Sequence, residues 1–175
     1  AIREKIDRIT PPSTLSRITK SERHCDIIAK LGESLIRNWL SRSGLEVVSV
    51  DHVGLDLIAY DPSTKRRMGI TVKSRTRTRR ENEGVNLFGS EEDDRRKLLK
   101  ACESFGCKPW IGVYVETSNG GDVYLTSLNH YDRKYRSKAK RWETWKMSKA
   151  YRELYKKDAK VWHIRFEFDI MRWTG

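Results

Sequence analysis

The chain has 175 residues, of which 36 are Lys or Arg and 24 are Asp or Glu, so its formal net charge at pH 7 is +12. This length suits a single domain with a sizeable core, and the content of aliphatic and aromatic residues excludes wholesale disorder. No apolar stretch reaches the roughly 18–20 residues of a membrane-spanning helix, so we expect no membrane association. The excess of positive charge favours a polyanionic partner, with nucleic acid as the first candidate.

The first 20 residues are polar and basic and contain the pair Pro11–Pro12. They indicate an arm or linker ahead of one domain over residues 21–175. This segment has no uninterrupted hydrophobic core of the kind found in secretory signals, and the three cysteines lack the spacing of a disulfide framework. The four histidines are scattered and form no zinc-ligand pattern. We therefore expect reduced thiols and a cytoplasmic protein, nucleoid-associated if the source is prokaryotic.

The first strong periodicity predicts a helix over residues 21–43. Its apolar residues recur every three or four positions, and Gly44 follows as a typical C-terminal residue in the left-handed conformation; the apolar positions are Ile28, Leu31, Leu35 and Trp39, widened by Ile36 and Leu40. Glu33 lies on the flank of this stripe. Its carboxylate is therefore expected to face whatever the helix packs against.

Three strands are predicted next, over residues 45–50, 55–60 and 67–74. The last two flank the turn sequence "DPSTKR", which indicates a β-hairpin. Side chains alternate between the two faces of a strand. Asp56 therefore shares a face with Ile58, and Thr71 shares a face with Lys73.

The rest of the chain adds a second helix and further strands. Residues 74–89 are polar and are interpreted as a loop. The helix is expected to begin at Ser90, its N-cap, and to end at Gly106. The remaining elements are strands over 110–116 and 122–128, a basic insert over 133–160 that is helical near 148–157, and a last strand over 161–170. The order predicts an α/β fold with a mixed central sheet flanked by helices.

The segments "GESLIRNWL", "GLDLIAYD" and "ITVKSR" together resemble the PD-(D/E)xK nuclease superfamily, in particular its Holliday-junction-resolvase-like and restriction-endonuclease-like members. The motifs cover residues 28–75, and the matching order of elements covers residues 24–128. The resemblance implies a restriction-endonuclease-like αβββαβ core, to which the basic insert and the C-terminal strand are additions. It also implies an endonuclease that cleaves duplex or branched DNA with Mg²⁺ or Mn²⁺.

The resemblance also implies roles for individual residues. Asp56 corresponds to the metal-binding aspartate, Glu33 to the helix acid that binds the same metal, and Val72 to the donor of a backbone carbonyl. Lys73 corresponds to the catalytic lysine. This chemistry suits phosphodiester hydrolysis, because a divalent metal neutralises the phosphate and acidifies a water, while a lysine orients that water or stabilises the developing charge.

Thr71 departs from the family pattern, which has a carboxylate at this position of the third strand. A hydroxyl is neutral and a weak metal ligand. Either Glu33 supplies the missing charge, or the chain is a degenerate member that binds nucleic acid without cleaving it, or this sequence carries an inactivating replacement. Asp51 and Asp61 are weaker stand-ins, judged by their nearness in sequence. Whether the protein is an enzyme stays open on the sequence.

Each residue also has an ordinary structural explanation. Asp56 would be a turn residue, Glu33 would pair with Arg37 four positions on, and Lys73 would keep a strand end in water. A basic adaptor that docks on an acidic protein is a third class of function. The nuclease interpretation is favoured because three independent coincidences would have to fall in the family's order.

Two basic stretches are candidates for nucleic-acid contact. In "KSRTRTRR", Arg75, Arg77 and Arg79 would share one strand face, with Arg80 beside them. Residues 133–160 hold 12 Lys or Arg against 3 acids, and include the candidates Lys138, Lys140 and Arg141. Aromatic residues are interleaved there, and we favour their packing on the sheet over base stacking. A second copy of the chain is a further candidate partner.

Overall fold

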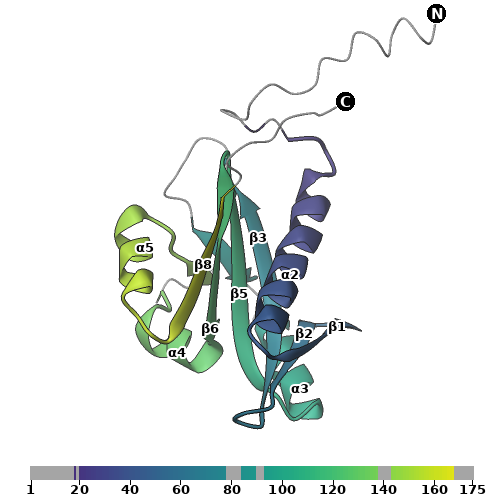
Figure 1. Ribbon diagram of the computed structural model, residues 1–175. Helices are drawn as coiled ribbons and strands as arrows, with labels where there is room; N and C mark the ends of the chain where they lie inside the picture. Colours follow the sequence, from purple (N-terminus) through teal and green to yellow (C-terminus); the bar gives the residue numbers. More distant parts are fainter. Residues whose placement is uncertain (1–17, 19, 78–83, 90–92, 138–142, 168–175) are drawn as a thin grey trace, which may run out of the picture.

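A computed structural model describes residues 18, 20–77, 84–89, 93–137 and 143–167. Six strands form one mixed sheet in the order β1-β2-β3-β5-β6-β8, and a further pair, β4 and β7, forms a small second sheet (Figure 1). The strands are β1 (Glu46–His52), β2 (Leu55–Asp61), β3 (Arg66–Thr76), β4 (Val85–Phe88), β5 (Lys108–Thr117), β6 (Gly120–Ser127), β7 (Glu143–Trp145) and β8 (Val161–Glu167). The helices are α2 (His24–Arg42), α3 (Asp93–Ser104), α4 (Leu128–Lys134) and α5 (Lys149–Lys156).

The topology confirms the predicted fold class. β1, β2 and β3 pair in antiparallel fashion, and β3 then pairs with β5 in parallel. A parallel pair needs a crossover connection, which here contains α3. β6 and β8 extend the sheet on the far side of β5, again antiparallel. This is a helix, three strands, a helix and a strand, followed by additions, which is the expected αβββαβ core.

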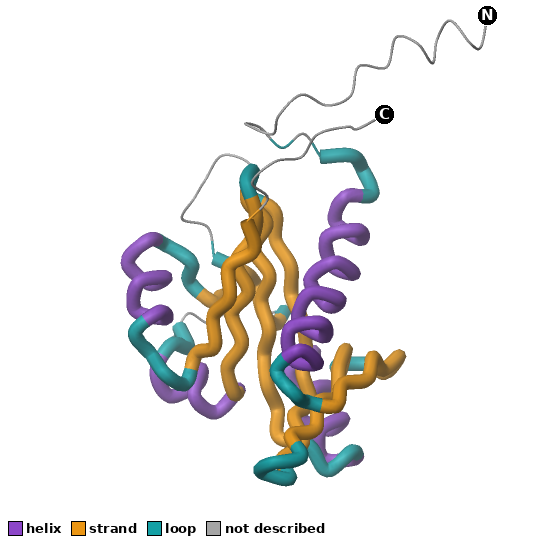
Figure 2. Tube along the Cα trace, viewed as in Figure 1, coloured by secondary structure: helices purple, strands orange, loops and turns teal. Residues whose placement is uncertain are grey.

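Helices cover both faces of the sheet, and each face has its own apolar core (Figure 2). On the first face, Ile28, Ile36 and Leu40 of α2 pack on even-numbered residues of β3 such as Ile70 and Val72. The second face is covered by α3, α4, α5 and the β4–β7 sheet. Because side chains alternate along a strand, odd-numbered residues of β3 turn to this second face.

Two segments differ from the sequence-based expectation. The interpretation of residues 74–89 as a loop is wrong, since β3 continues to Thr76 and β4 occupies Val85–Phe88. β4 pairs with β7, more than fifty residues later in the chain. A four-residue strand with so distant a partner leaves no local alternation by which it could be recognised. The predicted N-cap Ser90 lies outside the described residues.

Two glycines end helices as expected. Gly44 has a φ of +88° after α2, and Gly106 has a φ of +62° after α3, both in the left-handed region that ends helices. The cysteines are free thiols. The proposed arm over residues 1–20 is described only at residues 18 and 20, where Lys20 Nζ lies 3.5 Å from the carbonyl of Thr76. Within the described part of the chain, no helix is long and apolar enough to cross a membrane.

Candidate functional site

The candidate site lies where β2 and β3 part. Their ladder runs from Asp61 opposite Arg66 to Leu57 opposite Ile70 and ends there. The carboxylate of Asp56 takes the place of the next backbone partner. Its Oδ2 accepts a hydrogen bond from the N–H of Val72 at 2.6 Å and one from Thr71 Oγ1 at 3.2 Å. Beyond this point β3 continues, paired only with β5 within the main sheet.

Thr71 and Lys73 lie two residues apart on β3, so they share one face of the sheet. Asp56 lies beyond the last paired residue of β2, where strict alternation ends, because Leu55 packs in the core of the second face and Leu57 in the core of the first. The Asp56 carboxylate reaches the edge of β3 through its hydrogen bonds with Thr71 and Val72. At this strand edge it is also near enough to α2 for its charge to act on Glu33.

Lys73 is not at a strand end, because β3 continues for three more residues. Its side chain is half-buried. The ammonium group has no hydrogen bond or ion pair with any of the residues that the structure describes. A half-buried cation without a protein partner is available for a ligand or a water.

The backbone carbonyl of Val72 projects toward the gap beside Asp56. In a strand, the N–H and C=O of one residue project to the same side. The N–H of Val72 donates to Asp56, so its carbonyl is directed to the same opening. This orientation is the one required of a carbonyl that would share a cation with the Asp56 carboxylate.

Glu33 approaches this site from α2. Burial raises the pKa of its carboxyl, and the negative charge of Asp56 raises it further, while Lys30 acts in the opposite direction. The two carboxylates are thus close enough to repel one another. The predicted pairing of Glu33 with Arg37 is not seen, since Arg37 Nη1 donates instead to Ser49 Oγ of β1 at 2.9 Å.

Two contacts hold α2 close to the sheet. At its start, His24 Nε2 lies 2.8 Å from Glu116 Oε2 and 3.1 Å from Thr76 Oγ1. In its middle, Gly32 comes so near the sheet that a Cβ there would stand 2.2 Å from Ser74 Oγ and 3.0 Å from Tyr114 Cβ. Glu33 is the next residue, so the close approach at Gly32 sets the depth at which its carboxylate lies.

The oxygen ligands offered by Asp56, Glu33 and the Val72 carbonyl fit a small hard cation. They are one carboxylate fewer than in the PD-(D/E)xK pattern, because Thr71 replaces an acid. Neither Glu33 nor Asp56 forms an ion pair with the described residues, and Asp56 Oδ1 accepts no hydrogen bond from them. Two uncompensated carboxylates and a carbonyl suit Mg²⁺, which retains several waters. Among the described residues, however, no group of three or more His, Cys, Asp or Glu side chains is placed to hold a metal.

Neither alternative acid replaces the one absent at position 71. Asp61 lies at the other end of the hairpin, where its Oδ1 and Oδ2 accept hydrogen bonds from the turn residues Ser63 and Thr64. These hydrogen bonds lower the pKa of Asp61 to about 2. Asp51 is exposed on β1. The buried hydroxyl of Thr71 itself donates to Asp56 and adds no charge.

Only two of the residues predicted to contact nucleic acid, Arg75 and Arg77, belong to the described part of the chain. Arg75 is half-buried and donates from Nη1 to the carbonyl of Gly84 at 3.1 Å, while Arg77 donates from Nη2 to the carbonyl of Met147 at 2.9 Å. Both arginines therefore tie the strand end to neighbouring segments. The other candidates lie outside the described residues: Arg79, Arg80, Lys138, Lys140 and Arg141.

The aromatic residues of the basic insert that the structure describes pack, as favoured from the sequence, while Trp142 lies outside the described residues. Trp145 and Tyr155 are fully buried, and their rings contact those of Tyr131 and Tyr135. Tyr151 is half-buried beside Tyr155. These rings anchor α4, α5 and β7 to the second face of the sheet. They are not exposed as a stacking platform for bases.

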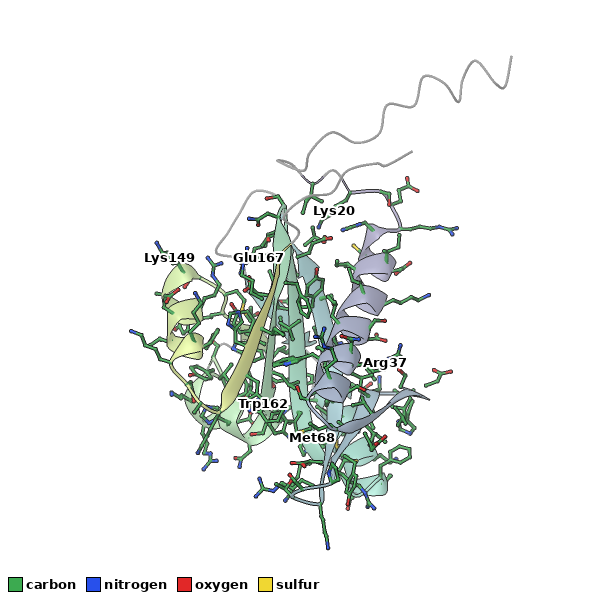
Figure 3. All side chains as sticks on the ribbon, in the orientation of Figure 1. Lys20, Arg37, Met68, Lys149, Trp162 and Glu167 are labelled. Carbon is green, nitrogen blue, oxygen red and sulfur yellow. The ribbon has the colours of Figure 1, made fainter. Side chains whose placement is uncertain are left out.

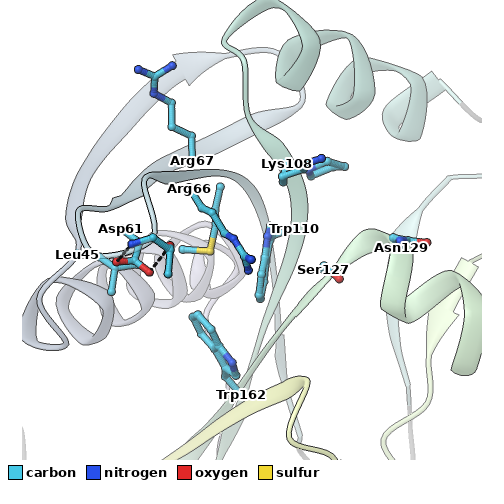
Figure 4. A pocket seen from close by; sticks show the side chains of 12 residues that line it. Leu45, Asp61, Arg66, Arg67, Lys108, Trp110, Ser127, Asn129 and Trp162 are labelled. Carbon is cyan, nitrogen blue, oxygen red and sulfur yellow. Dashed lines mark hydrogen bonds between the residues drawn. The ribbon is translucent and has the colours of Figure 1, made fainter.

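A cavity of about 630 Å³ lies away from the candidate site, at the other end of β3 (Figure 4). Trp110 and Trp162 form one wall with ring centroids 5.0 Å apart, and Arg66 projects beside them. Of the acids considered from the sequence only Asp61 lines this cavity, and neither Asp56, Glu33 nor Lys73 does. Its tryptophans contact one another and the core of the α2 face.

No family model matches the chain, and no curated protein matches it in sequence. Among solved structures it is similar to Hjc, a Holliday junction resolvase from Archaeoglobus fulgidus, at 12% identity and a TM-score of 0.49, over 72% of this chain and 88% of that one. It is also similar to a restriction endonuclease in complex with substrate DNA, at 13% identity and a TM-score of 0.40, over 91% of this chain and 81% of that one. Both likenesses concern the fold alone. Roles for individual residues have to come from the chain's own geometry.

Proposed function

We propose that the protein binds DNA and hydrolyses its phosphodiester bonds with the help of a divalent cation, Mg²⁺ or Mn²⁺. The observation that carries this proposal is the position of the Asp56 carboxylate, bonded to the backbone of Val72 where β2 and β3 part. The same carboxylate accepts a hydrogen bond from Thr71, two residues before Lys73 on β3, and lies near the charge of Glu33. This convergence is the one expected from the PD-(D/E)xK resemblance.

The residues of the candidate site would have different roles in the reaction. Asp56, Glu33 and the carbonyl of Val72 would hold the cation, which when bound neutralises phosphate charge and acidifies a water. Lys73, with no protein partner among the described residues, would orient the attacking water or stabilise the charge that develops on the phosphate. Thr71 would hold Asp56 in place through its hydroxyl, which donates to Oδ2.

A second function has its own supporting observation. The third-strand position holds the neutral Thr71, and no set of three acidic or other ligating side chains is found among the described residues. A nuclease fold with this composition would bind nucleic acid without cleaving it. The net charge of +12 supports DNA as the partner under both proposals, and the affinity should fall linearly on a log–log plot against salt. A second copy of the chain is proposed as a partner on the resemblance alone.

Cleavage of plasmid and branched DNA in Mg²⁺ or Mn²⁺ separates these functions. Active protein should lose cleavage in Lys73→Ala and Asp56→Asn. Lys100→Ala on the exposed side of α3 and Asp51→Asn on β1 are matched controls that should keep it. Equal cleavage by Lys73→Ala, Asp56→Asn and the parent would refute the assignment of the site.

If the parent protein does not cleave DNA, the variant Thr71→Glu should be tested, because it restores the third carboxylate. Cleavage gained by this variant, and lost again when Lys73→Ala is added, would indicate a site that lacks one acid only. Salt-sensitive DNA binding with no cleavage by Thr71→Glu would instead support the binding function. Absence of DNA binding above about 100–200 mM salt, where weak phosphate contacts fade, would favour the basic adaptor.

A further inference from the structure

A second cavity, of about 350 Å³, lies between α5 and the edge strand β8. Its charged lining comes from three elements and has four cationic side chains against two carboxylates: Lys149, Arg152, Lys156 and Arg165, with Asp122 and Glu153. Tyr124 and His163, whose rings stack 4.7 Å apart, complete it. Figure 3 shows Lys149 at the start of α5 and Glu167 at the end of β8 at about the same height of the molecule. The cavity is separate from the site at Asp56.

Asp122 does not neutralise the whole lining. This buried carboxylate is fully engaged, because Oδ1 lies 2.8 Å from His163 Nε2 and Oδ2 accepts from Arg165 Nη1 at 2.9 Å. Burial alone would raise the pKa of Asp122, but the hydrogen bond from His163 and the charge of Arg165 outweigh it and lower the pKa. Arg165 also donates to Glu167 and Asn119. The pair of Asp122 and Arg165 therefore fixes the wall of the cavity.

Arg152 has no such partner. Its Nε is buried and makes no hydrogen bond within the described structure, and its guanidinium forms no ion pair there. A buried donor without an acceptor destabilises the folded state, and more so when the group is charged. A guanidinium retained under these conditions is explained by a ligand that supplies acceptors. Planar guanidinium groups match the oxygens of phosphate particularly well.

The remaining cations of α5 point to the same ligand. Lys149, Arg152 and Lys156 are spaced by three and four residues, so they lie on one side of the helix. Tyr155 is fully buried and packs α5 onto the sheet, so this cationic side is not needed to anchor the helix. Lys156 is paired with Glu153 at 2.9 Å, but Lys149 makes no ion pair with the described residues. Arg152 and Lys149 thus face the cavity without an ion pair to any described residue, although the charge of Arg152 also helps to lower the pKa of Asp122 and that of Lys149 the pKa of Glu153.

We propose that this cavity binds a phosphate group, held mainly by Arg152 and Lys149. The cavity is large enough for a phosphate together with part of the molecule that carries it. The phosphate would be a terminal or internal phosphate of a nucleic acid, or a free phosphate anion. The proposal goes beyond DNA cleavage at Asp56 and does not depend on it, because no residue of that site lines the cavity.

The sheet register relates the two sites. Lys73 is opposite Val113, Val113 is opposite Tyr124, and Tyr124 is opposite His163. The lysine of the candidate active site and the histidine of the cavity therefore lie in one row on one face. The buried aromatic core lies between them, so a ligand in the cavity does not touch Lys73.

Calorimetric titration with inorganic phosphate, without metal, tests the proposal on the full chain. Saturable binding is expected for the parent, weakened about tenfold or more in Arg152→Gln, because a charge-assisted hydrogen bond contributes about 1.5–3 kcal/mol. Arg133→Gln, an exposed position on α4, removes the same charge outside the cavity and should change affinity less than about twofold by that reasoning. Phosphate should also raise the melting temperature of the parent and of Arg133→Gln, but not of Arg152→Gln.

A short single-stranded oligonucleotide, with and without a 5′-phosphate, identifies the source of the phosphate. A terminal phosphate is the ligand if only the phosphorylated strand loses affinity in Arg152→Gln. An internal phosphate is the ligand if both strands lose it equally. A free anion is the ligand if inorganic phosphate alone depends on Arg152.

Two results would overturn the proposal. One is the absence of saturable binding by the parent to inorganic phosphate and to both strands. The other is an equal loss in Arg152→Gln and Arg133→Gln, which would show a diffuse positive field and no site. Should Arg152→Gln fail to fold, Lys149→Gln replaces it, with an affinity unchanged from the parent as the contradicting outcome. Cleavage lost in Lys73→Ala with phosphate binding retained would show that the two sites are independent.

Discussion

Asp56 Oδ2 accepts the backbone N–H of Val72 at 2.6 Å, so a side chain of β2 occupies the place of a backbone acceptor on β3. This hydrogen bond lies immediately beyond the last pair of the β2–β3 ladder, Leu57 opposite Ile70. It engages Oδ2, while Oδ1 accepts no hydrogen bond from the described residues. Under the proposed function, the same carboxylate would serve both the fold and the chemistry.

Glu33→Gln should stabilise the protein at neutral pH. The pKa of Glu33 is raised above its ordinary value of 4.5, first by burial and then by the charge of Asp56, so the folded protein binds this proton more tightly than the unfolded chain does. Stability therefore falls as pH rises from 4.5 through the folded pKa, and it stays lower at pH 7. The gain from removing the charge should be roughly 0.2–1 kcal/mol, the range for partly exposed charges.

Urea unfolding at pH 4 and pH 7 measures this effect. The difference in unfolding free energy between Glu33→Gln and the parent should be larger at pH 7 than at pH 4. Glu46→Gln on β1 is an exposed control, for which no such pH dependence is expected. A Glu33→Gln variant that is less stable than the parent at pH 7 would show that the carboxylate has a stabilising partner.

Mg²⁺ should reverse the repulsion between Glu33 and Asp56. A cation held by both carboxylates lowers the pKa of Glu33, and it raises the melting temperature by binding only the folded state. Glu33 can be followed by NMR titration with and without 10 mM Mg²⁺, chosen as roughly ten times a millimolar dissociation constant. Asp56→Asn should abolish both effects, whereas Asp51→Asn should keep them. Identical shifts in all three proteins would place the cation elsewhere.

Gly32→Ala should destabilise the protein and disturb the site together. The new Cβ would stand 2.2 Å from Ser74 Oγ, which can rotate away, and 3.0 Å from Tyr114 Cβ, which cannot, so we expect α2 to shift slightly away from the sheet. Overpacking of this kind costs about 1–3 kcal/mol, which exceeds the gain of up to about 1 kcal/mol in helix propensity. Displacement of α2 also moves Glu33 away from Asp56 and should bring its pKa closer to the ordinary value.

Ser34→Ala, on the exposed side of the same helix, is the matched control for Gly32→Ala. It changes helix propensity without adding a contact to the sheet, so its unfolding free energy should stay the same or rise slightly. Chemical denaturation compares the two variants. Equal stability of Gly32→Ala and Ser34→Ala would mean that the close approach at Gly32 has no energetic importance.

Asp158→Asn should destabilise the packing of α4 against the start of β8. Asp158 Oδ2 lies within 2.8 Å of His130 Nε2, Lys134 Nζ and Tyr135 Oη. Burial opposes the ionised form, but these hydrogen bonds outweigh it and lower the pKa of Asp158. The variant should lose about 1.5–3 kcal/mol at pH 7, the value of hydrogen bonds to a charged group.

The sign of the pH dependence follows from the lowered pKa of Asp158. The stabilisation is fully present above the ordinary value of 3.8 and is lost as pH falls through the folded pKa. The stability difference between the parent and Asp158→Asn should therefore shrink in acid. Thermal unfolding at pH 3 and pH 7 measures it, with Asp94→Asn on the exposed start of α3 as control. A difference that grows in acid would contradict this account.

The sequence was sufficient for the central hairpin because its signals are local. Alternation within residues 55–60 and 67–74 predicts which side chains share a face, and the turn "DPSTKR" fixes the pairing. These signals predict that Thr71 and Lys73 share one face of β3 and that Asp56 lies on the neighbouring strand. The periodicity of one helix predicts that Glu33 lies on the flank of its apolar stripe.

Features built from distant segments could not be predicted in this way. The partner of β4 lies in β7, and neither strand is long enough to show alternation. The hydrogen bond from Val72 to Asp56 depends on where two strands separate, which periodicity does not encode. The cavity at Arg152 needs α5, β6 and β8 to come together. Its only trace in the sequence is the spacing of Lys149, Arg152 and Lys156, which is also typical of an ordinary solvated helix.

The row of paired residues from Lys73 to His163 fixes the distance between the candidate active site and the phosphate cavity. Three inter-strand spacings separate the two residues, about 14 Å in all, and backbone hydrogen bonds hold each spacing nearly constant. Substitutions can change what each end of the row binds, but they cannot bring the ends closer together. A ligand that engages both ends at once must itself be long enough to pass around the core, and a different span would require a strand to be inserted or deleted.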